Sequence, residues 1–165
     1  TTTGKPGTVN ERGRLYRLDF DVANPAGPTS LSVVLDGSEG VVSPDNIDIN
    51  RQGELVICED PVPDLRAIPG RERTDTRLWV YDTRADSLWP ALEVNRAAVT
   101  KHFRAAGAGT VEDDKPGDWE FSGVIDAEHL LGRGAWLFDV MAHSLEPADS
   151  TVAQGGQILR LDWKR

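Results

Sequence analysis

Two polar stretches of the chain carry side-chain oxygens of the kind that hard cations bind. Asp45 and Asn46 form one stretch, and Glu59 and Asp60 form the other at the end of an apolar run. Calcium takes about six to eight oxygen ligands from carboxylates, amides and backbone carbonyls. A hairpin between the two stretches would bring these four side chains to neighbouring positions, which predicts a cation site. The alternative is an ordinary Pro-Asp-Asn turn and a solvated acid at a strand end.

Two later stretches place polar residues inside apolar strands. Glu120 and Ser122 are two residues apart, and Asp139 and His143 are four apart, so each pair falls on one face of its strand. A buried, ionised Asp139 is costly unless it is paired or bound to a metal, which makes it a candidate ligand. His143 has two interpretations, a ligand or a structural histidine held by hydrogen bonds.

The other reactive residue types give no catalytic signature. Cys58 is the only cysteine and lies in an apolar run, so we expect it to pack in the core and exclude an internal disulfide or a multi-cysteine zinc site. The sequence has no Gly-x-Ser-x-Gly elbow, P-loop or dinucleotide fingerprint. His102 and His129 sit in polar loops, and we assign them no role.

Composition narrows the classes of partner. The chain has 27 acidic and 18 basic residues, and the basic ones are scattered, so nucleic acid is not an expected partner. The acidic surplus fits either surface solvation or cation binding. No apolar run approaches the roughly 18 residues of a membrane span, and the start has no signal-peptide h-region, so any export signal would lie outside this chain.

Short runs rich in Val, Ile, Leu, Trp and Tyr alternate with Gly, Pro, Asn and Asp, which predicts an all-β chain. Turn residues between consecutive runs predict three hairpins, and Pro90, which lacks an N–H donor, belongs in an edge strand. The expected strands are Arg14–Phe20, Ser30–Leu35, Asn46–Ile49, Leu55–Glu59, Arg77–Tyr81, Ser87–Val94, Glu120–Asp126, Ala135–Ala142 and Gln157–Trp163.

Helical structure is expected in only two short places. Asn95–Ala106 could form a helix capped by its first residue, and Ala127–Leu131 a single turn capped by Asp126. The connections Pro61–Thr76 and Arg96–Asp118 exceed the about 12–15 residues of most structureless loops. They are therefore functional loops, contain small helices, or are mobile.

The strands group as the blades of a β-propeller would. Residues 43–95 hold four successive strands of one blade, 14–35 would supply two outer strands of a preceding blade, and 119–163 three strands of a following one. A closed propeller needs at least about four blades of four strands. We therefore expect a partial propeller of two to three antiparallel blades, completed by another chain, another copy or a cleaved fragment. The alternative is a self-contained sandwich.

Five phrases, read in order and spacing, resemble the C-terminal part of PhoX-type phosphatases over about Gly13 to Leu161. The Trp-Leu-Phe-Asp-Val-x-Ala-His phrase is the most specific. The phrases are Ser43-Pro44-Asp45-Asn46-Ile47, Cys58-Glu59-Asp60-Pro61, Trp119-Glu120-Phe121-Ser122-Gly123-Val124-Ile125-Asp126, Trp136-Leu137-Phe138-Asp139-Val140-Met141-Ala142-His143 and Gly155-Gly156-Gln157-Ile158-Leu159.

The resemblance implies a secreted or periplasmic bacterial β-propeller that hydrolyses phosphate monoesters at a calcium- and iron-containing site near the propeller axis. Members of that family are longer than this chain. By position, the candidate metal and site residues are Glu59, Asp60, Glu120, Asp139 and His143, with Asp45 and Asn46 lining the same end.

The sequence also departs from the expected pattern. Gln154 stands where an acidic residue is more usual, and Met141 replaces a polar residue. Both changes remove polarity near the expected site. Two functions therefore remain open: a metal-dependent phosphoester hydrolase, and a non-catalytic, calcium-stabilised propeller that serves as an extracellular binding or assembly module.

Overall fold

The computed structural model describes residues 1–5, 8–60, 76–95, 97–98, 101, 110–111, 119–142, 145–146 and 155–163. These residues form a mostly β structure, with nine antiparallel strands in three sheets, one short helix, and a further pair of two-residue strands. The all-β class is thus confirmed. The nine strands are β1 (Leu15–Phe20), β2 (Thr29–Leu35), β3 (Pro44–Ile49), β4 (Glu54–Glu59), β5 (Arg77–Asp82), β6 (Ser87–Glu93), β8 (Trp119–Asp126), β9 (Ala135–Ala142) and β11 (Gly155–Asp162).

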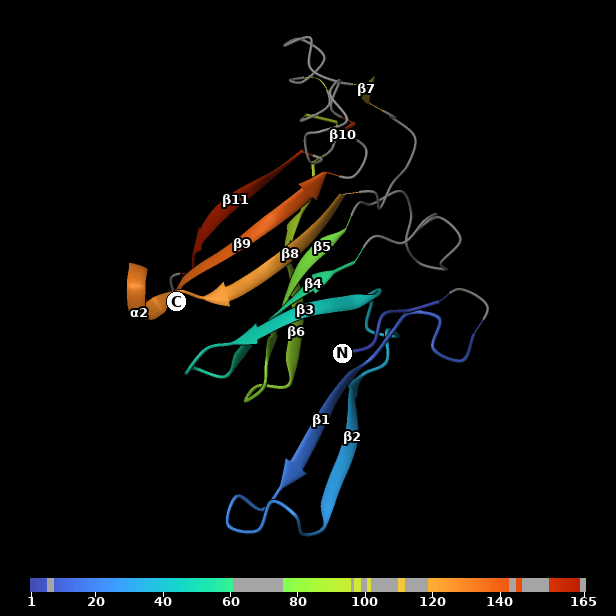
Figure 1. Cartoon of the computed structure of the whole chain (residues 1–165), viewed down its shortest axis with the longest axis vertical. Helices are drawn as coiled ribbons and strands as arrows, with labels where there is room; N and C mark the ends of the chain where they lie inside the picture. Colours follow the sequence, from blue (N-terminus) through green and yellow to red (C-terminus); the bar gives the residue numbers. More distant parts are fainter. Residues whose placement is uncertain are drawn as a thin grey trace.

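In each of the three sheets, strands that follow one another in the sequence pair with each other (Figure 1). β1 and β2 form a hairpin, β3-β4-β5-β6 form the middle sheet, and β11-β9-β8 form the third sheet. These sheets hold two, four and three strands, the same numbers as the predicted grouping. No closed sheet and no propeller is detected in the described part of the chain, so the partial propeller stays a prediction.

Local sequence explains the turns of the middle sheet. Gly53 has a φ of 82° between β3 and β4, a value that glycine adopts without a steric penalty. Pro90 lies in β6, which is an edge strand of this sheet, as its missing N–H requires. The remaining two-residue strands, β7 (Thr110–Val111) and β10 (Leu145–Glu146), pair with each other.

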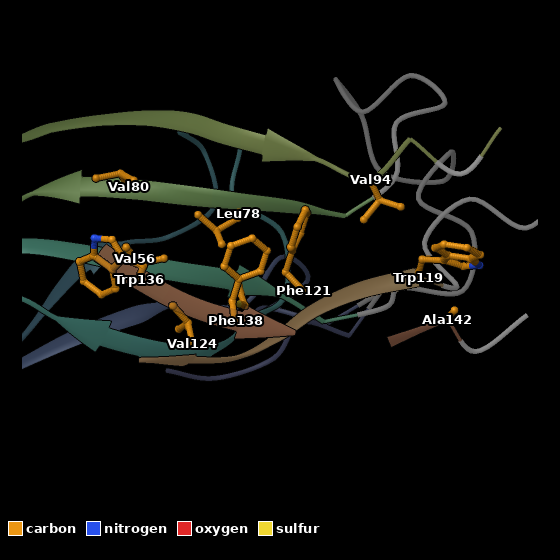
Figure 2. Packing of buried hydrophobic residues seen from close by; sticks show 11 residues of the cluster. Val56, Leu78, Val80, Val94, Trp119, Phe121, Val124, Trp136, Phe138 and Ala142 are labelled. Carbon is orange, nitrogen blue, oxygen red and sulfur yellow. The ribbon is translucent and has the colours of Figure 1, made fainter. Parts of the chain in front are cut away.

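The middle sheet is covered on both faces, because every residue of β4 is buried. Successive residues of a strand point to opposite faces, so Val56 and Cys58 belong to one core cluster and Leu55 and Ile57 to another. The first cluster lies between the middle and third sheets, where the Phe121 and Phe138 rings pack 5.7 Å apart (Figure 2). Its buried members are Val56, Cys58, Leu78, Val80, Val94, Trp119, Phe121, Val124, Trp136, Phe138 and Ala142.

The second cluster lies on the other face of the middle sheet. Leu15 and Leu35, at the base of the β1–β2 hairpin, pack there with Trp79. The three sheets therefore follow one another as layers, with the middle sheet between the hairpin base and the third sheet.

The helical predictions are partly corrected. The helix α2 (Glu128–Leu131) exists, but its N-cap residue is Ala127 rather than Asp126. The Asp126 carboxylate still accepts a bond of 2.9 Å from the Glu128 N–H. In the expected helix 95–106, residues 97, 98 and 101 are helical, and the other positions after 95 lie outside the described residues.

The predictions for the two long connections concern residues that the structure mostly does not describe. Most of the two long connections, 61–76 and 96–118, lies outside the described residues. Within the described residues, no helix has the length and apolar character needed to cross a membrane.

Candidate functional site

Glu59, predicted as a metal ligand, is a buried hydrogen-bond acceptor at the end of β4, with 1% of its surface exposed. Its Oε1 accepts bonds from the Val42 N–H at 2.9 Å and the Trp79 indole N–H at 2.8 Å. Its Oε2 accepts a bond of 2.8 Å from the Arg77 N–H. Both carboxylate oxygens therefore hold neighbouring segments together, a role that residue type alone did not predict.

Asn46 joins β3 of the middle sheet to β8 of the third sheet. Its Oδ1 accepts bonds from the Ser122 hydroxyl at 2.6 Å and the Gly123 N–H at 3.1 Å. Two residues along β3, Asp48 Oδ2 accepts a bond of 2.7 Å from the Asp126 N–H. Side chains of β3 thus satisfy backbone donors of β8, which fixes the two strands side by side.

A bulge in β8 positions Asp139. The pairing of β8 with β9 shifts between Ser122 and Ile125, and Gly123 has a φ of 56° there. An interior glycine is a common sign of a bulge, so this feature had a signal in the sequence. A Cβ added at Gly123 would collide with Asp139 Oδ1. The Asp139 carboxylate therefore lies across the bulge.

Asp45 and Asp60 interact through their negative charges. Asp45 is exposed in β3, and Asp60 follows β4, where its N–H donates a bond of 2.9 Å to the Ser43 carbonyl. Partial burial, and then the charge of Asp60, raise the pKa of Asp45 above its ordinary value. A bound cation would relieve this repulsion.

Three of the predicted acids share the neighbourhood of Cys58. Burial raises the pKa of this thiol to about 12, and the charges of Asp139, Asp45 and Glu120 add to that rise. The Val124 N–H, in the β8 bulge, faces the sulfur and acts in the opposite direction. Carboxylates from β3, β8 and β9 therefore act on one buried group, and Cys58 is a core residue as predicted.

The charges of Asp45, Glu120 and Asp139 act on Cys58, and the charge of Asp60 acts on Asp45. Glu59 and Asn46 accept hydrogen bonds from neighbouring segments. The prediction for His143 lies outside the described residues, as does Gln154. Among the described residues, no group of three or more His, Cys, Asp or Glu side chains could hold a metal ion. The metal site stays a prediction.

Comparison of the chain with protein-family models, with curated proteins and with solved structures found no match. The resemblance to PhoX-type proteins therefore rests on the residue phrases themselves.

Proposed function

We propose that this chain is a segment of a metal-dependent phosphoester hydrolase of PhoX-like type and supplies part of its propeller and some of its metal-binding carboxylates. The observation that supports the proposal is that the charges of Asp45, Glu120 and Asp139, from three strands of two sheets, all act on the Cys58 thiol. Because the described residues alone hold no group of three that could bind a metal ion, further ligands would come from the rest of the propeller.

The chemistry of the donors suits calcium better than a softer metal, because carboxylate oxygens are hard ligands. Asp45, Asp60, Glu120 and Asp139 would hold the ion, with His143 and further residues of the completed propeller filling its coordination shell. Iron is proposed from the resemblance only. A bound cation would neutralise phosphate charge and activate an oxygen nucleophile. The resemblance also supports a secreted or periplasmic location.

A second candidate is a non-catalytic, calcium-stabilised propeller that acts as an extracellular binding or assembly module. The hydrogen bonds of Glu59 and Asn46 favour it, because two of the seven expected site residues are engaged in holding segments together. The partly exposed Met141 on β9 favours it as well, since it adds no ligand oxygen. In this case calcium would stabilise the fold without turnover.

A phosphatase assay on material that contains the complete propeller separates the two candidates. We expect turnover of a phosphate monoester that chelator removes, that added calcium restores, and that Glu120→Gln abolishes. Glu93→Gln is the matched control, because Glu93 is an exposed acid in β6 that binds Arg77. Calcium-dependent stabilisation without turnover would support the binding module instead. If chelator changed neither turnover nor stability, both candidates would fail.

A further inference from the structure

We draw no further inference here: the strongest candidate, the exposed apolar face of the β1–β2 hairpin beyond its buried base, where Leu18, Phe20 and Leu31 lie, carries nothing because nothing in the structure shows what covers it.

Discussion

The carboxylate of Glu59 offers the sharpest test of how this chain is held together. Glu59→Gln keeps the size of the side chain and removes its charge. With the amide oxygen in the Oε1 position, the substituted side chain can still accept from Val42 and Trp79, but its NH₂ group then faces the Arg77 N–H. One partly buried donor loses its acceptor, which costs about 1–3 kcal/mol. Glu59→Ala leaves all three donors without an acceptor and should cost about 3–9 kcal/mol.

Urea denaturation followed by circular dichroism measures these changes in the free energy of unfolding. If the slope of that free energy against urea concentration is the same in the variants and the wild type, the denatured state is unaffected. Glu93→Gln is the matched control, because Glu93 binds the side chain of the same Arg77 at an exposed site. That change should cost less than about 1 kcal/mol.

Repeating the measurements in calcium and in chelator separates anchoring from metal binding. An anchoring role predicts the same loss for Glu59→Gln in both conditions, because the three donors belong to the protein. If Glu59→Gln cost no more than Glu93→Gln, or if its cost vanished in chelator, the structural assignment of Glu59 would be refuted.

Three further predictions concern the junction of the sheets. Asn46→Ala should cost about 1–2 kcal/mol in urea denaturation, and adding Ser122→Ala should cost less than the sum of the single changes, because the two residues share a hydrogen bond. Gly123→Ala should destabilise the chain by about 1–2 kcal/mol because the φ of Gly123 is positive. In a chain that also carries Asp139→Ala, the cost of Gly123→Ala should be smaller, because the added Cβ no longer collides with the Asp139 carboxylate. Equal costs with and without Asp139→Ala would contradict this. Cys58, whose pKa burial raises to about 12 from an ordinary 9.0, should resist alkylation until the chain unfolds, as mass spectrometry would show. Between these two pH values the thiol ionises only in the unfolded chain, so stability should fall as pH rises, and Cys58→Ala should flatten that slope.

Local sequence was sufficient to predict the nine longer strands. The predicted range Ala135–Ala142 is the observed β9, in which Trp136 and Phe138 are buried and Leu137 and Asp139 are less buried. The other eight predicted strands differ from the observed ones by one or two residues at their ends. The pair β7 and β10 was not predicted, because two-residue strands from distant segments leave no local pattern.

The site was harder to predict, because its contacts join residues far apart in the chain. Glu59 was expected to bind metal from its residue type and its place at a strand end. In the structure its carboxylate accepts hydrogen bonds from Val42 and Trp79, which are 17 and 20 residues away. Asn46 meets β8 across more than 70 residues. Sequence alone identified oxygen-bearing side chains but not which donors would occupy them.

The junction between β3 and β8 has a consequence for how such a chain can lengthen. Side chains of Asn46 and Asp48, rather than a backbone ladder, meet the donors of β8. Polar side chains therefore join the two sheets without continuing the hydrogen-bonded ladder of either one. A duplicated unit could be added at such a junction without any existing strand having to change its register.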